Sequence, residues 1–77
     1  MKLEKYFTLK NSFTQNEIAK QINGYQPDVS AWIHNKKKIP LHFALAIEKV
    51  TNGMVSVNEL PLSNSAKKTL EQINNNV

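Results

Sequence analysis

Apolar side chains recur at intervals of three and four residues along most of this 77-residue chain, which is the spacing of one face of an α-helix. Gly24 and Gly53 lie in gaps between the periodic segments, and Pro27, Pro40 and Pro61 lie where a segment begins or breaks. The pattern predicts an all-α fold of four to five short helices. The length allows one domain at most, covering residues 1–77 with a core at about 2–62.

Local start and stop signals place the expected helices. Thr14 is followed three residues later by Glu17, and this combination predicts a capping box at a helix start. The Asn-Gly pairs at 23–24 and 52–53 predict helix ends, since both residue types tolerate a positive φ. We expect helices at about residues 2–9, 15–22, 26–34, 40–51 and 65–74.

The segment at residues 55–60 is expected to form one helical turn, because Ser56 and Glu59 repeat the capping-box pattern. Pro40 is expected at the first position of its helix. The predicted core consists of the apolar stripes of the helices: Leu3, Tyr6, Phe7, Ile18, Ala19, Ile22, Val29, Trp32, Ile33, Leu41, Phe43, Ala44, Leu45, Ile47 and Val50.

The charge of the chain favours a polyanionic partner. Ten basic residues stand against six acidic ones, for a formal charge of +4 and a pI near 9.5. Three of the lysines, Lys36, Lys37 and Lys38, follow the predicted third helix directly. They are expected to bind phosphates, although a solvated loop would show the same pattern. Because every basic residue is Lys, the bidentate contact of Arg with guanine is excluded.

The residue types also exclude several kinds of chemistry. The chain has no Cys, which excludes disulfide scaffolds and thiol chemistry, and His34 and His42 are its only histidines. We find no Gly-rich phosphate loop, no carboxylate pair with a plausible cleft and no cofactor motif, so we expect no enzyme activity, no cofactor and no metal. No apolar run reaches the length of a signal peptide or a membrane span, and we expect a soluble, cytoplasmic protein.

The second and third expected helices are joined by only a few residues, which predicts a helix-turn-helix unit. The motif runs through residues 15–22 and 29–32 and continues with Lys38-Ile39-Pro40, Ala46-Ile47-Glu48, Thr51, Gly53, Val55 and Leu60. Over about residues 13–62 this sequence resembles the lambda-repressor-like DNA-binding domains of phage Cro and repressor proteins, most closely their Cro/YdaS-type group.

The resemblance implies a site on double-stranded DNA. Gln15, with Asn16 beside it, would bind a backbone phosphate at the start of the second helix. The third helix would enter the major groove, where its outward residues reach base edges: Gln26, Pro27, Ser30 and Ala31. Residues flanking them would lie near phosphates: Tyr25, His34, Asn35, Lys36, Lys37 and Lys38. Gln26 could instead be a plain helix start, but its amide could pair with adenine, and base contact is the favoured role. Pro27 and Ala31 could equally be plain helix residues.

The turn departs from the pattern of the resembling group. That group usually has Gly where Asn23 stands, an apolar residue at Gly24, and Ser or Thr as the helix cap at Tyr25. Asn adopts the left-handed conformation, so the turn is expected to form. Tyr is a poor cap, and the third helix is expected to begin at residue 26 or one residue later.

The function that this resemblance implies is a sequence-specific transcriptional repressor of the phage Cro type, which would exclude polymerase from a promoter in a bacterial host. A homodimer on a pseudo-palindromic operator is expected. Leu70 and Ile73 of the last helix, with Met54, Val55 and Val57, are the candidate dimer surface, or else that helix packs on its own core. Two alternatives remain open: a YdaS-type antitoxin that binds DNA and a toxin, and a helical protein-interaction module.

Overall fold

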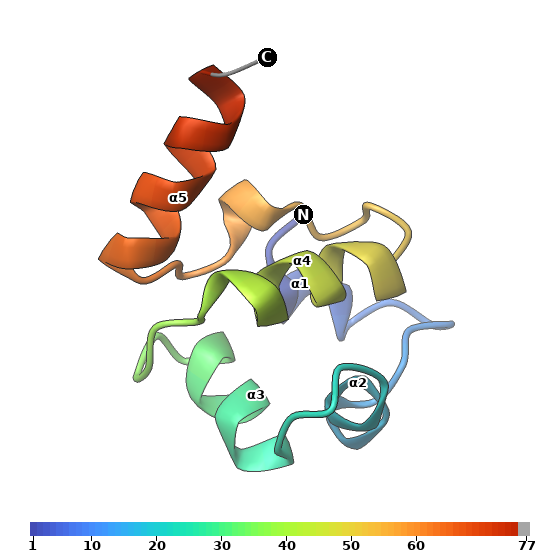
Figure 1. The fold of residues 1–77 in the computed structure, drawn as a ribbon. Coiled ribbons are helices and arrows are strands. Elements are labelled where there is room, and N and C mark those ends of the chain that lie inside the picture. Colours follow the sequence, from blue (N-terminus) through green and yellow to red (C-terminus); the bar gives the residue numbers. More distant parts are fainter. Residues whose placement is uncertain (76–77) are drawn as a thin grey trace.

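A computed structural model describes residues 1–75 and, over that range, consists of helices joined by short loops (Figure 1). The prediction of an all-α fold of four to five short helices is confirmed. The elements are α1 (Leu3–Tyr6), α2 (Gln15–Gln21), α3 (Gln26–Ile33), α4 (Leu41–Val50), a single 3₁₀ turn η1 (Val57–Glu59) and α5 (Asn64–Asn75).

The core is formed by apolar residues from every helix and from the segments between the helices. Ile18, Val29 and Ile47 of α2, α3 and α4 are fully buried, as the stripes predicted. Ile39 and Val55, which lie between helices, are also fully buried. Ile39 pairs with Leu62 in an isolated parallel bridge, in which the Ile39 N–H donates to the Pro61 carbonyl at 2.8 Å. This bridge fastens the loop before α4 to the segment before α5.

The capping box predicted at the start of α2 is confirmed. The Thr14 hydroxyl accepts a hydrogen bond from the Glu17 N–H at 3.1 Å, and the Glu17 carboxylate accepts one from the Thr14 N–H at 2.9 Å. Because each side chain satisfies a backbone donor of the first turn, the start of α2 is well defined.

Three helices end in the same way, with an asparagine in the left-handed conformation. Asn23, Asn35 and Asn52 follow α2, α3 and α4 with φ values of 58°, 57° and 55°. After each of them the next N–H donates back into the last turn, as Gly24 does to the Ala19 carbonyl at 2.8 Å. This is the Schellman arrangement, in which Asn takes the position that Gly usually occupies. The stops predicted at 23–24 and 52–53 are confirmed, whereas the stop at Asn35 lacks a following glycine.

Two helix boundaries differ from the prediction. The first helix, expected at about 2–9, ends at Tyr6, because the following N–H groups of Thr8 and Leu9 donate three residues back and tighten the chain into turns. Pro40 precedes α4 as its N-cap in an extended conformation, with ψ at 152°, and is not its first helical residue.

Leu45 was expected in the core of α4, but its side chain is 44% exposed. Leu45 follows Ala44 by one residue, about 100° around the helix, and this turns it away from the buried stripe of Ala44 and Ile47.

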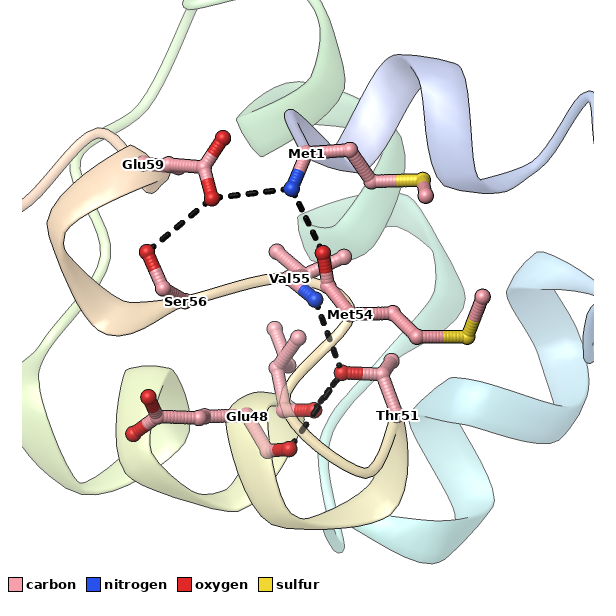
Figure 2. Close-up of polar contacts among 8 residues, drawn as sticks. Met1, Glu48, Thr51, Met54, Val55, Ser56 and Glu59 are labelled. Carbon is pink, nitrogen blue, oxygen red and sulfur yellow. Dashed lines mark hydrogen bonds and ion pairs between the residues drawn. The ribbon is translucent and has the colours of Figure 1, made fainter.

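The helical turn expected within residues 55–60 forms as η1, but the expected capping box is absent. The backbone N–H of Glu59 donates to the Ser56 carbonyl, and the Ser56 hydroxyl donates to the Glu59 carboxylate at 3.0 Å. That carboxylate also accepts a hydrogen bond from the Met1 amino group at 2.8 Å (Figure 2). In a capping box the Glu59 carboxylate would accept a hydrogen bond from the Ser56 N–H. Here the Met1 amino group, far away in the sequence, takes the place of that N–H.

Helix α5 begins at Asn64, where the preceding Ser63 hydroxyl accepts a hydrogen bond from the Ala66 N–H at 3.1 Å. Ala66 is buried, Leu70 is half-buried against the core and Ile73 is 52% exposed, so burial decreases along the helix. Figure 1 shows α5 leaning away from the other helices. Within residues 1–75, no helix is both long and apolar enough to cross a membrane.

Candidate functional site

The site built by α2 and α3 depends on the four-residue turn between them, residues 22–25. Asn23 reverses the chain through its positive φ of 58°. Gly24 then allows close packing, because a Cβ there would lie 3.3 Å from Ile22 Cγ1 and 3.6 Å from the Phe43 ring. The turn therefore combines an asparagine that reverses the chain with a glycine that leaves room for the Ile22 side chain.

The structure shows at which residue α3 begins. Tyr25 is the N-cap in an extended conformation, its side chain makes no capping hydrogen bond, and the helix begins at Gln26, the earlier of the two expected positions. Pro27 lies in the first turn, where its missing N–H leaves no hydrogen bond unmade. The Tyr25 side chain is 75% exposed and projects from the turn.

The two sides of α3 differ sharply. Val29 and Trp32 are 0% and 3% exposed, so they mark the side of α3 that faces the core. Trp32 packs against Phe43 with ring centroids 5.5 Å apart, which excludes a role for this indole in base stacking. Helical spacing puts four residues around the opposite side, all exposed or half-exposed: Pro27, Ser30, Ala31 and His34. This outer face carries no carboxylate and no lysine.

A side-chain hydrogen bond joins the two helices at one edge of the outer face. The Gln26 Nε2 group donates to Gln15 Oε1 at 3.0 Å. The structure thus brings together two residues that were predicted to have separate roles, one toward a phosphate and one toward a base. Asn16, next to Gln15, is exposed.

An ion pair lies at the other edge of the outer face. The Lys37 ammonium donates to Asp28 Oδ1 at 2.8 Å. Gln26 and Asp28 are two residues apart in α3, so they lie roughly 160° apart around the helix axis and border the outer face on both sides. The sequence carries no signal for this ion pair, because Asp28 and Lys37 are nine positions apart and no helical spacing relates them.

Lys36, Lys37 and Lys38 lie in the loop after α3, and the end of that helix determines the path of the loop. Asn35 has a φ of 57°, and the Lys36 N–H donates to the Ala31 carbonyl at 2.9 Å, so the chain turns back toward the helix. Lys36 and Lys38 are exposed and have no ion-pair partner among residues 1–75. The outer face of α3 is thus uncharged, and the loop that follows this helix carries two exposed lysines without an ion-pair partner in the described part of the chain.

Near the start of α2 a carboxylate is held in its charged form. The Thr14 N–H, followed by the Thr14 hydroxyl, lowers the pKa of Glu17 below its usual value of 4.5, and the charge of Lys20 acts in the same direction. The described residues, 1–75, contain no cluster of three potential metal ligands.

These observations describe an all-helical domain with a short-turn helix pair that presents an uncharged polar face beside exposed lysines. Residues 13–61, more than half of the chain, match the family described as bacterial toxin YdaS, and the protein belongs to that family. The expected similarity to the YdaS-type group, over about residues 13–62, is confirmed over residues 13–61. No curated protein and no solved structure matches the chain.

Proposed function

We propose that this protein binds double-stranded DNA with the outer face of α3 in the major groove and represses transcription by covering a promoter. The observation that carries the proposal is the Gln15–Gln26 hydrogen bond beside an uncharged helix face. An α-helix fits the major groove, and the small residues of this face would allow close approach to base edges.

The direction of the Gln15–Gln26 hydrogen bond suits simultaneous contacts with a phosphate and a base. Gln26 uses one amide hydrogen on Gln15, so its other N–H and its oxygen stay free to pair with N7 and N6 of adenine. Gln15 uses only its oxygen, so its own N–H groups are free to donate to a phosphate. We infer that Gln15 positions Gln26 while it binds the DNA backbone.

The first experiment measures affinity for duplex DNA against salt concentration. If Lys36 and Lys38 bind phosphates, the double variant K36A/K38A should lower the slope of log K against log salt by about 1.8, or 0.9 per contact. The matched control is K67A/K68A, which removes the same charge from exposed positions on α5 and should leave the slope nearly unchanged. A wild-type affinity that is absent or independent of salt would contradict DNA binding.

A second measurement tests base recognition. Sites selected from random duplexes should contain an adenine opposite Gln26, and Gln26→Ala should remove that preference at a cost of roughly 1–3 kcal/mol for the preferred base. Gln15→Ala should weaken the same preference, because Gln26 then loses its partner. If Gln26→Ala weakens binding to all sequences equally, Gln26 does not contact a base.

Repression further requires two copies of the chain, because one unit covers only a half-site. We infer a homodimer on DNA, with half-sites about 10 bp apart. Val55 and Val57 are buried, at 0% and 7% exposure, and the prediction that they contribute to the dimer surface is wrong. Ile73 and Met54, 52% and 44% exposed, remain candidates, and their replacement by Ser would test pairing by sedimentation on operator DNA.

The family description as a bacterial toxin supports a second candidate function, in which accumulation of the protein stops bacterial growth. Controlled expression in a bacterial host would test it, with growth as the readout. If the wild type stops growth and K36A/K38A does not, the toxic effect acts through the proposed DNA surface. If both stop growth equally, it acts through another surface, as the protein-interaction alternative requires. If the protein instead restores the growth of a host that expresses a toxin encoded by a neighbouring gene, the antitoxin alternative is supported.

A further inference from the structure

We propose that the ion pair between Asp28 and Lys37 keeps this lysine from binding a DNA phosphate. The ion pair thereby lowers the affinity of the protein for DNA of any sequence. The inference rests on the proposed DNA-binding function. It assigns to Asp28 the role of a carboxylate that competes with the DNA backbone for one ammonium group.

The geometry of the loop after α3 explains how Lys37 reaches the first turn of that helix. With eight residues, α3 is about 12 Å long. The left-handed residue Asn35 and the hydrogen bond from Lys36 to Ala31 turn the loop back toward the helix, and the long Lys37 side chain reaches Asp28. The neighbouring Lys36 and Lys38 carry the same charge in the same loop but have no such partner among the described residues.

The ion pair lies where a phosphate could compete for it. The side chains of Lys37 and Asp28 are 59% and 30% exposed, so the ammonium remains within reach of solvent and of a DNA strand. A carboxylate and a phosphate bind the same ammonium group in similar ways, and contact with one reduces contact with the other. Asp28 also borders the outer face of α3, so a DNA backbone placed beside that face would come close to the pair.

The expected effect follows from counterion release. One additional phosphate contact changes the slope of log K against log salt by about 0.9. Removal of the Asp28 charge should therefore steepen the slope by about 0.9 and raise affinity by roughly eightfold at 0.1 M salt, relative to an unchanged value at 1 M. Since phosphates carry no sequence information, the increase should be equal for unrelated duplexes.

The experiment compares the full-length wild type with Asp28→Asn on two duplexes of unrelated sequence over a range of salt concentrations. Glu71→Gln, at an exposed position on α5, is the matched control for net charge and should leave the slope nearly unchanged. Circular dichroism at the assay temperature should show equal helix content in all variants.

A double-mutant cycle with Lys37→Ala separates competition from simple repulsion between Asp28 and DNA. Competition predicts that Asp28→Asn has little effect once Lys37 is absent. An equal gain with and without Lys37 would overturn the inference in favour of repulsion, and so would a gain no larger than that of Glu71→Gln. In both cases wild-type binding would persist and the proposed function would stand. If the wild type shows no salt-dependent binding, the proposed function fails and the inference fails with it.

Discussion

Thr51 is the buried polar residue of the described core, with 3% of its surface exposed. Its hydroxyl donates to the Ile47 carbonyl at 2.8 Å and accepts a hydrogen bond from the Val55 N–H at 3.2 Å (Figure 2). One side chain therefore bonds to the last turn of α4 and also satisfies a buried backbone donor of the following loop. A polar residue is tolerated at this depth because both of its hydrogen-bonding functions are used.

We expect Thr51→Val to lower the free energy of unfolding by about 1–3 kcal/mol, because the buried Val55 N–H would lose its acceptor while the packing volume changes little. Urea unfolding followed by circular dichroism measures the change. Thr51→Ser keeps the hydroxyl and should cost less than Thr51→Val. Equal stability of Thr51→Val and the wild type would show that the hydrogen bond contributes nothing net.

At the scale of elements, the helices are defined mainly by their ends. Asn23, Asn35 and Asn52 each end a helix with a positive φ, a conformation that costs Asn less than other residues with a side chain but more than Gly. Asn52 follows α4, outside the proposed DNA surface, and is exposed. Its replacement therefore tests the helix end without altering the site.

Asn52→Gly should raise the free energy of unfolding by up to about 1 kcal/mol, and Asn52→Ala should lower it by about 1 kcal/mol. Asn58→Gly is the matched control, because Asn58 is an exposed asparagine without a positive φ. That control should lose stability, since glycine increases the entropy of the unfolded chain. A gain for both glycine variants would contradict the role assigned to the φ of Asn52.

Elements determined by neighbours in the sequence could be predicted, and those determined by distant partners could not. The Thr14–Glu17 box and the left-handed Asn23 depend on residues within one turn, so their pattern is sufficient. The pairing of Ile39 with Leu62 joins two loops in which helical periodicity carries no signal. In the candidate site, the outer residues of α3 follow from periodicity, whereas the Asp28–Lys37 ion pair depends on the path of a loop.

At the scale of the whole molecule, the first residue is tied to the segment before α5. The Met1 amino group donates to the Met54 carbonyl at 2.6 Å and to the Glu59 carboxylate at 2.8 Å (Figure 2). The Met1 ammonium, and then the Ser56 hydroxyl, lower the pKa of Glu59 below its usual value of 4.5. The charged form of Glu59 is therefore favoured in the folded protein.

This shift predicts a pH dependence of stability. Because the pKa is lower in the folded state, the contribution of Glu59 is fully present above about pH 4.5 and is lost as the pH falls through the folded-state pKa. Glu59→Gln should lower stability at neutral pH and flatten its acid dependence, measured by thermal unfolding between about pH 6 and pH 3. Glu71→Gln is the control and should retain the wild-type dependence. If the curves of Glu59→Gln and the wild type run parallel, Glu59 gains nothing from Met1.

The tie between Met1 and Glu59 spans 58 positions of the chain, and this has a consequence for synthesis. The amino-terminal segment leaves the ribosome before residues 54 and 59, so its ammonium group meets its two partners, the Met54 carbonyl and the Glu59 carboxylate, only late in synthesis. Leu3 and Tyr6, which are buried in the finished fold, would stay exposed over the same interval. The α2–α3 pair, made in between, can form its local hydrogen bonds earlier, so the DNA-facing helices would take shape before the core that supports them is closed.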